Sequence, residues 1–469
     1  METSRFFSIL DGVARKLDGR YPGLTAVIEF DLGVDGCYSL VAEGGVCRAV
    51  GGAQGGERGA VWAQIAGQEE DVIGLLTGKI APQYAAQAGR FSLSGDGQIL
   101  RALAEGVRLE LDAGEPLSLL SGLFPAERLR DVLLDRANWK PFPTIEEREA
   151  WDALPQSVRE ALLAGGESAL MQEWPHTPAV RYLDYARDGN RSRYQDLAFR
   201  RRRMLGSLVL AECIEAEGRF LDEIANGIWL ICEESSWCVP AHITVQRAGV
   251  GLPDTSEPIV DLFAAETSAL LSWVDYLLGA RLDVVSPLIR PRVRREIDAR
   301  ILTPCLERDD FWWMGFMPRR VNNWNPWINS NWLTSALLME VDPERRVEAV
   351  AKSMRSIDRF LDPYPRDGGC DEGPGYWGRA GASLLDCLEL LYSATDGQID
   401  LYSNDLVQEI GRFIYRVQIA DNWFVNFADA SAVVSPTPSV VYQYGLRIGD
   451  ADMMAMGAWL AEDQDLAHP

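Results

Sequence analysis

Residues that could do chemistry gather in four segments of the chain. Each segment combines tryptophan with amide, carboxylate or guanidinium side chains. Flat indole rings surrounded by hydrogen-bond donors and acceptors suit a sugar, which has apolar C–H faces and hydroxyl edges. The same composition also suits an aromatic core with capping amides, but four such segments favour a carbohydrate groove. The segments are residues 226–242, 311–332, 367–379 and 421–429.

The elements that must position these segments are mostly helical. Long amphipathic stretches joined by short connections predict an all-α domain over residues 146–469, either a bundle or helical hairpins arranged in a ring. Proline or glycine separates most of the stretches. The predicted helices are 145–152, 156–171, 191–216, 219–233, 259–279, 288–308, 330–340, 344–361, 378–394, 404–418 and 449–461.

Residues 1–110 have a different texture, with short alternating apolar runs separated by glycine turns. This pattern predicts a small α+β domain with a mostly antiparallel sheet. Residues 111–145 contain four prolines around one short helix at 126–135 and are predicted to be a linker. The predicted strands are 25–31, 37–41, 47–50, 60–65 and 90–94, and the predicted helices of this domain are 5–17, 68–76 and 82–88.

Composition excludes several classes of protein. The chain has 469 residues and a formal net charge of −24, which disfavours binding to DNA or RNA because phosphates need a cationic surface. The four arginines at 200–203 point in different directions on a helix, so most are expected to be solvated or paired. The eight cysteines show no C-x-x-C spacing. No signal peptide or membrane span is visible, so we expect a cytoplasmic protein. We expect neither a metal nor a cofactor.

The N-terminal domain resembles the sterol carrier protein 2-like domain. The resemblance rests on the strand–turn–strand at 37–50, the segment LLTGKIAPQYA at 75–85 and GRFSLSGD at 89–96. It implies an apolar tunnel that binds a lipid or another apolar ligand. The alternative is a sheet that packs its helices around a filled core and serves as a structural or interaction module.

Residues 153–460 resemble the helical domain of the heparinase II/III-like family. The resemblance implies an incomplete α/α toroid and a polysaccharide lyase that cleaves uronic-acid-containing glycans by β-elimination. The family's C-terminal β-sandwich has no counterpart here, so we expect either a fragment or a protein that has kept sugar binding without catalysis. The matching stretches are WPHTPA at 174–179, GRFLD at 218–222, IWLICEESSWCVPAH at 228–242, NNWNPWI at 322–328, DEGPGYW at 371–377 and VNFAD at 425–429.

β-Elimination needs hydrogen-bond donors that neutralise the uronate carboxylate, a base, and an acid for the leaving oxygen. Tyr376 follows a rigid Gly-Pro-Gly turn and is the candidate acid or base, unless its ring packs the turn. His242 is the candidate partner base or a structural histidine. Asn323 and Asn325 are candidate neutralisers. Many lyases of this type carry an Asn-His pair, but Trp324 follows Asn323 here, which leaves that role open.

Further residues of the four segments are candidates for substrate binding. Glu372 could orient Tyr376, bind a sugar hydroxyl or cap the following helix. Arg320 and Arg379 could pair with substrate carboxylates or sulfates. The remaining candidates are Trp237, Trp324, Trp327, Trp377 and Glu234.

Two other functions stay open. A toroid glycoside hydrolase would need two acids flanking the scissile bond. A protein that only binds a glycan together with a lipid would need no such pair. The net charge of −24 argues against a polyanionic substrate unless an arginine-lined groove or a short, weakly charged oligosaccharide offsets the repulsion. The acids available for hydrolysis are Glu233, Glu234, Asp371, Glu372 and Asp429.

Overall fold

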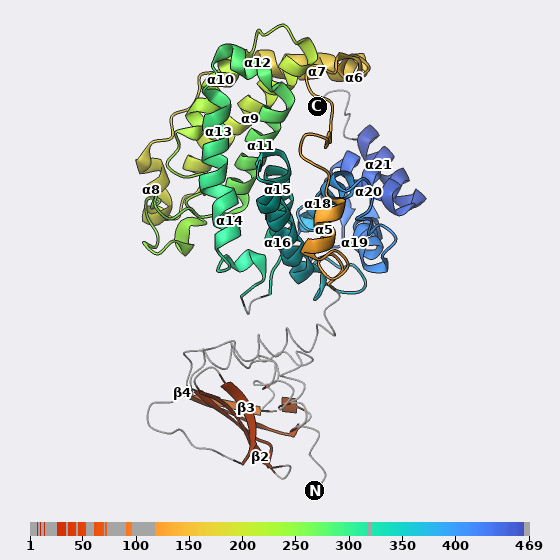
Figure 1. The fold of residues 1–469 in the computed structure, drawn as a ribbon. Helices are drawn as coiled ribbons and strands as arrows, with labels where there is room; N and C mark the ends of the chain where they lie inside the picture. Colours follow the sequence, from red (N-terminus) through yellow and green to blue (C-terminus); the bar gives the residue numbers. More distant parts are fainter. Residues whose placement is uncertain are drawn as a thin grey trace. The chain divides into compact units, whose positions relative to one another are not determined.

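The structure is a computed structural model in which the chain divides into two units (Figure 1). The first unit consists of residues 1–117 and 315–320, and the second of residues 118–314 and 321–469. Each unit is described by itself. The residues that the structure describes are 7, 10, 14, 26–33, 36–43, 46–52, 61–69, 71–72, 91–95, 118–317 and 320–463.

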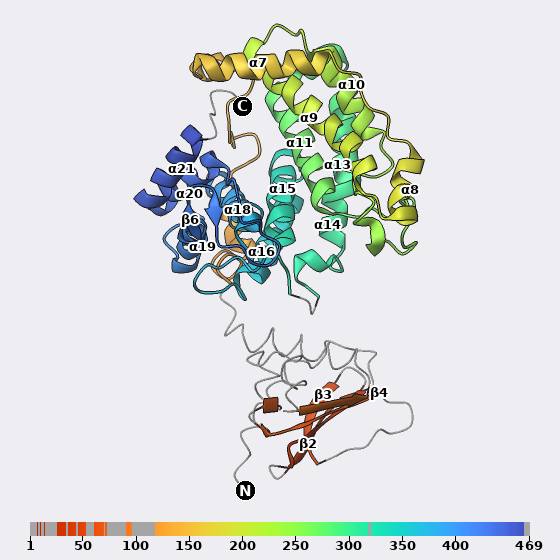
Figure 2. The same ribbon diagram turned by 180° about the vertical axis from the view of Figure 1, so that it is seen from behind.

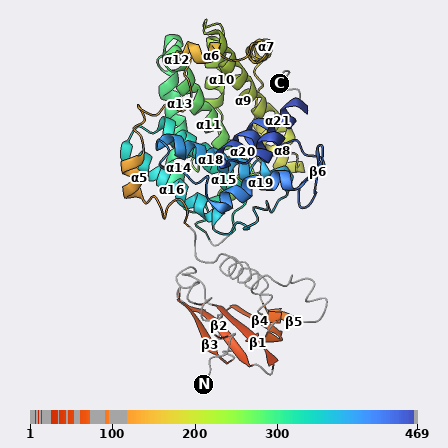
Figure 3. The same cartoon turned by 90° about the vertical axis from the view of Figure 1, so that its right-hand side faces the viewer.

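The first unit contains a five-stranded mixed sheet with the order β3-β2-β1-β4-β5 (Figure 3). β1 pairs with β4 in parallel, and the other three pairings are antiparallel. All residues from Ala26 to Phe30 are buried, so both faces of the central strand β1 are covered. All five predicted strands are confirmed within two residues at each end. The strands are β1 (Ala26–Asp31), β2 (Cys37–Glu43), β3 (Val46–Gly51), β4 (Val61–Gly67) and β5 (Phe91–Gly95).

The predicted helices 5–17, 68–76 and 82–88 lie largely or wholly outside the described residues, as does the segment 75–85. The second unit is helical, as predicted. Its helices are α5 (Ala126–Val132), α6 (Arg148–Asp152), α7 (Gln156–Leu170), α8 (Ala179–Asp188), α9 (Ser192–Glu215), α10 (Leu221–Cys232), α11 (Leu262–Leu278), α12 (Ala280–Val285), α13 (Ile289–Ile297), α14 (Thr303–Glu307), α15 (Trp324–Met339), α16 (Pro343–Leu361), α17 (Pro374–Trp377), α18 (Gly381–Ala394), α19 (Asp405–Arg416), α20 (Pro438–Ile448) and α21 (Ala451–Asp463).

Helix α15 lies at the centre of the second unit and packs against α11, α16 and α18 (Figures 1 and 2). It is buried on nearly every side, so its polar residues must find partners inside the fold. Asn329 donates its amide to Ser356 Oγ at 2.9 Å and accepts a hydrogen bond from Ser353 Oγ at 2.8 Å. These bonds fix α15 against α16.

The described part of the predicted linker, residues 118–145, belongs to the helical unit. Helix α5 packs against α16. The carboxylate of Asp358 accepts the backbone N–H groups of Leu120 and Ser121 at 2.9 and 2.8 Å, and Asp362 accepts that of Ser118 at 3.0 Å. Two carboxylates of α16 therefore anchor this segment, a long-range interaction that the proline content did not predict.

Helix α15 begins at Trp324, six residues before the predicted start at 330. Pro326 lies in the first helical turn, where backbone N–H groups have no helical partner and proline is tolerated. Helices α8, α12, α17 and α20 were not predicted. A short hairpin, β6 (Gln418–Ala420) and β7 (Trp423–Phe424), follows α19. Among the described helices, none has the length and apolar character needed to cross a membrane.

Candidate functional site

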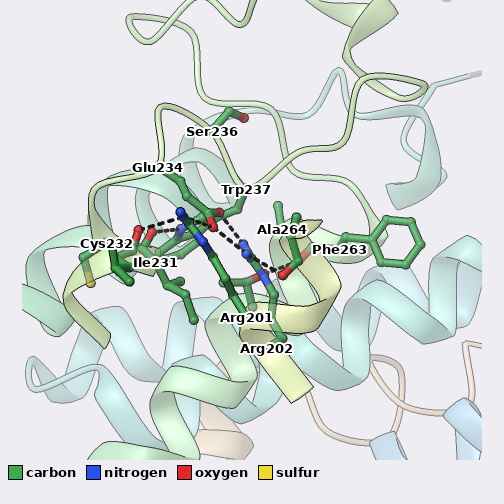
Figure 4. Close-up of polar contacts among 12 residues, drawn as sticks. Arg201, Arg202, Ile231, Cys232, Glu234, Ser236, Trp237, Phe263 and Ala264 are labelled. Carbon is green, nitrogen blue, oxygen red and sulfur yellow. Dashed lines mark hydrogen bonds and ion pairs between the residues drawn. The ribbon is translucent and has the colours of Figure 1, made fainter. Parts of the chain in front are cut away.

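A buried ion-pair cluster holds the first aromatic segment in place (Figure 4). Glu234 bonds to Arg201 Nη1 at 3.0 Å and to Arg202 Nη2 at 2.6 Å, and its side chain is only 2% exposed. Trp237, three residues further along the segment, donates its indole N–H to the carbonyl of Ile231 at 2.9 Å. Glu234 and Trp237 therefore stabilise the fold around the segment and do not face a ligand.

His242 ends this segment in a defined orientation. Its Nδ1–H donates to Asp261 Oδ2 at 2.8 Å, because a carboxylate can only accept. Asp261 is itself fixed, since its other oxygen caps α11 by accepting Ala264 N–H at 2.8 Å. In neutral His242 the second ring nitrogen, Nε2, is then the acceptor, which is the form that a general base requires.

An aromatic wall joins the first segment to the second. The ring centroids of His242 and Trp324 are 4.5 Å apart, and Trp312 lies 5.1 Å from Trp324. Phe263 of α11 stacks on His242 at 5.6 Å and meets Trp327 edge-on at 6.0 Å. Trp324 and Trp327 are three residues apart on α15, so they share one half-buried face of that helix.

Two amide side chains donate hydrogen bonds to the carboxyl group of Glu372. Asn322 Nδ2 donates to Oε1 at 3.0 Å, and Asn323 Nδ2 donates to Oε2. Burial raises the pKa of Glu372, and the nearby charges of Asp371 and Asp429 raise it further, whereas the two amides act in the opposite direction. The hydrogen bonds join the second segment to the third. The charge of Asp429, in the fourth segment, also acts on Glu372, so the fourth segment lies near this carboxyl group.

The turn that carries Tyr376 packs tightly against the fourth segment. Gly373 has φ +86°, and a Cβ there would lie 2.6 Å from the carbonyl oxygen of Phe427. Glycine is therefore required at this position. Tyr376 follows with 36% of its surface exposed, and its hydroxyl makes no hydrogen bond to the described residues. The phenol is free to meet a ligand.

Arg379 lies over the indole of Trp327, with Cζ 4.0 Å from the ring centroid. Its Nη1 is 3.3 Å from Glu266 Oε1, and the same oxygen accepts the Trp327 indole N–H at 2.8 Å. Glu266 keeps 37% of its side chain exposed, yet burial raises its pKa.

Asp386 of α18 has the same character. Its side chain is exposed, but burial raises the pKa of its carboxyl group to about 6, with a smaller increase from Glu389 and an opposing effect of Arg379. The ordinary value for aspartate is about 3.9. Asp386 is therefore half-protonated near pH 6 and can act as an acid or a base in mildly acidic solution.

Replacement of Asp386 by asparagine tests this environment. Between about pH 4 and 6 the folded protein holds a proton on Asp386 that the unfolded chain has released, so folding stability should fall as pH rises through this window. The Asp386→Asn variant lacks this loss. Its melting temperature relative to the original protein should therefore be higher at pH 7 than at pH 4. A control variant, Asp131→Asn on the exposed face of α5, should show no such trend. If the difference in melting temperature between Asp386→Asn and the original protein did not change with pH, the prediction would be contradicted.

The structure separates the predicted site residues into two groups. His242, Asn323, Trp324, Trp327, Glu372 and Arg379 lie in one connected set of contacts, and Tyr376 lies between two of its members on the third segment. Arg320 lies in the segment 315–320 that groups with the first unit.

Four predicted residues lie in the interior instead. Asn325 is fully buried and donates its amide to the carbonyl of Ser356 at 2.8 Å. Trp377 is 1% exposed and donates to the carbonyl of Ile410. With Glu234 and Trp237, these side chains are buried and donate or accept hydrogen bonds within the fold, so we correct their assignment from substrate binding to structural support.

Sequence reasoning did not select Asn322, Asp261, Glu266 or Asp386. Asn322 had a signal, since it adjoins Asn323 in the same motif. Asp261 could have been found as a helix cap before an apolar stretch. Glu266 carries no local signal, because tertiary packing brings it to Arg379, more than a hundred positions away. Asp386 lies seven residues after Arg379, but the burial that raises its pKa cannot be seen in the sequence. Within the described ranges, no group of three or more His, Cys, Asp or Glu side chains could hold a metal ion.

Neither a scan against protein-family models nor a search of the curated proteins finds a match to this chain.

Proposed function

We propose that the chain is a carbohydrate-active lyase that cleaves uronic-acid-containing glycans by β-elimination. One observation carries the proposal: the four aromatic segments, far apart in sequence, make one chain of contacts. His242 touches Trp324, Asn322 binds Glu372, and the turn at Gly373 packs on Phe427. In this proposal the helices form an incomplete α/α toroid, and the glycan lies across the surface that these segments share.

Each group then has a role in the elimination. Trp324 and Trp327 provide apolar faces for sugar rings. The amides of Asn322 and Asn323, which bind Glu372 in the free protein, donate hydrogen bonds to the uronate carboxylate when it displaces Glu372, and they make the adjacent C–H more acidic.

Proton transfer is assigned to the two remaining groups. His242 Nε2 accepts the proton next to the uronate carboxylate, and the Tyr376 hydroxyl donates a proton to the leaving glycosidic oxygen. Arg379, which lies on Trp327, neutralises substrate charge.

A glycoside hydrolase is the second candidate, because two carboxyl groups, Glu266 and Asp386, have the properties that hydrolysis requires. Glu266 and Asp386 are both accessible, both have raised pKa values, and both interact with Arg379. Hydrolysis of a glycosidic bond uses one protonated and one ionised carboxyl group. This pair differs from the acids that the sequence suggested.

One assay separates the candidates. The purified chain is incubated with uronic-acid-containing and neutral oligosaccharides, and ultraviolet absorbance is followed together with new reducing ends. A lyase forms a C=C bond, so absorbance and reducing ends rise together. Reducing ends without absorbance would replace the lyase with the hydrolase. Binding without either product would leave a glycan-binding protein.

For the first unit we propose an apolar ligand such as a lipid, as the resemblance implies. Displacement of a fluorescent acyl probe from the full chain by fatty acids tests this. Absence of probe binding would leave residues 1–110 as a structural or interaction module.

A further inference from the structure

A groove of about 390 Å³ lies in the helical unit beside the β6–β7 hairpin and helix α21. It adjoins the start of the fourth segment, at Asp421, but it shares none of the side chains given a role in the candidate site above. Figure 2 shows the hairpin next to α19–α21. The residues of this groove that matter here are Tyr415, Gln418, Asp421, Asp452, Met456 and Trp459.

The polar groups of the groove are mainly unoccupied acceptors. The carboxylates of Asp421 and Asp452 have no hydrogen-bond donor or cationic partner among the described residues. Gln418 already donates its amide to the carbonyl of Asp421 at 2.8 Å, and the Tyr415 hydroxyl donates to Asp450 at 3.4 Å. Asp452 lies in the first turn of α21, where its charge favours the helix dipole, but that interaction leaves its oxygens open.

The apolar part of the groove is aromatic and polarizable. Tyr415 and Trp459 contribute rings, and Met456 contributes a thioether. Aromatic faces attract cations through the ring quadrupole, and a cation with apolar substituents also gains by covering these surfaces. Carboxylates beside aromatic rings therefore match a cationic organic group in both charge and shape.

We propose that this groove binds an organic cation, an alkylammonium group whose charge lies between Asp421 and Asp452 and whose carbon substituents contact Tyr415 and Trp459. A hard metal ion fits less well, because Ca²⁺ takes six to eight oxygen ligands and the described residues offer no cluster of three His, Cys, Asp or Glu side chains. A neutral sugar fits less well too, because its hydroxyl groups need donors as well as acceptors.

The probe for the test is choline, measured against the full chain by calorimetry and tryptophan fluorescence at about 0.15 M salt, which screens general attraction to the net charge of −24. Its neutral carbon isostere, 3,3-dimethylbutan-1-ol, has the same shape without the charge. We expect choline to bind and the isostere to bind at least about fivefold more weakly, in line with cation–π strengths.

Variants locate the site. Asp421→Asn and Asp452→Asn keep side-chain size and should each weaken choline binding at least about fivefold, whereas the control Asp131→Asn removes the same charge from α5 and should leave it unchanged. Undetectable choline binding, equal binding of the isostere, or equal weakening by Asp131→Asn would each overturn the proposal. Displacement of choline by millimolar Ca²⁺ at constant ionic strength would assign the groove to an inorganic cation instead. None of these outcomes depends on lyase or hydrolase activity.

Discussion

Replacing Tyr376 by phenylalanine should lower the rate of product formation by about 10²- to 10⁴-fold, the contribution typical of a positioned acid or base. The change removes one hydroxyl group and leaves the ring on the rigid turn that follows Gly373. Initial rates with the oligosaccharide that the assay identifies measure the effect. The loss should appear in kcat, because the proton transfer belongs to the transition state and not to ground-state binding.

This variant separates catalysis from stability. The Tyr376 hydroxyl has no hydrogen-bond partner among the described residues, so its removal leaves no buried group unsatisfied. The unfolding midpoint should therefore stay unchanged. Tyr442 of α20, which is also exposed, gives the matched control, and Tyr442→Phe should retain full activity. If Tyr376→Phe kept its activity, the elimination mechanism would need another proton carrier.

The helical unit could be predicted from local patterns to a large extent. Apolar spacing found most of the long helices, and glycine turns found all five strands of the sheet. The predicted start of α15, at 330, was six residues too late, although proline in a first turn is compatible with a helix that starts before it. Residues 118–145 were predicted to be part of a linker, but they belong to the helical unit. The carboxylates that hold them, Asp358 and Asp362, lie more than two hundred positions away at the end of α16, so no local pattern indicates the contact.

The candidate site could be predicted by segment but not by side chain. On helix α15, Asn325 points into the core, whereas Trp324 and Trp327 face the site. This division follows from helical spacing, so it could be predicted only if α15 were known to include these residues. Composition cannot distinguish an exposed tryptophan from one such as Trp377, whose indole N–H is satisfied inside the fold. Glu266 becomes a functional candidate only because tertiary packing brings it to Arg379, and Asp386 only because burial in the fold raises the pKa of its carboxyl group.

The same distinction decides the fate of Glu234. Sequence suggested a sugar ligand, whereas the structure buries its carboxylate between Arg201 and Arg202. Glu234→Gln keeps the size of the side chain but leaves two buried guanidinium groups without their counter-charge. Breaking a buried ion pair from one side costs about 3–5 kcal/mol, because the remaining charge stays desolvated. We expect the free energy of unfolding to fall by about that amount in urea titrations.

The control for this prediction is an exposed ion pair. Arg130 and Glu344 are 48% and 68% exposed, so Glu344→Gln should leave the urea midpoint almost unchanged, because solvent screens the pair. If Glu234 bound a sugar instead, its glutamine variant would keep its stability and lose only substrate affinity. The predicted loss of stability has a functional consequence as well, since the segment that Glu234 anchors leads directly to His242. Partial loosening of this segment should weaken the contact between His242 and Trp324 before the helices themselves unfold.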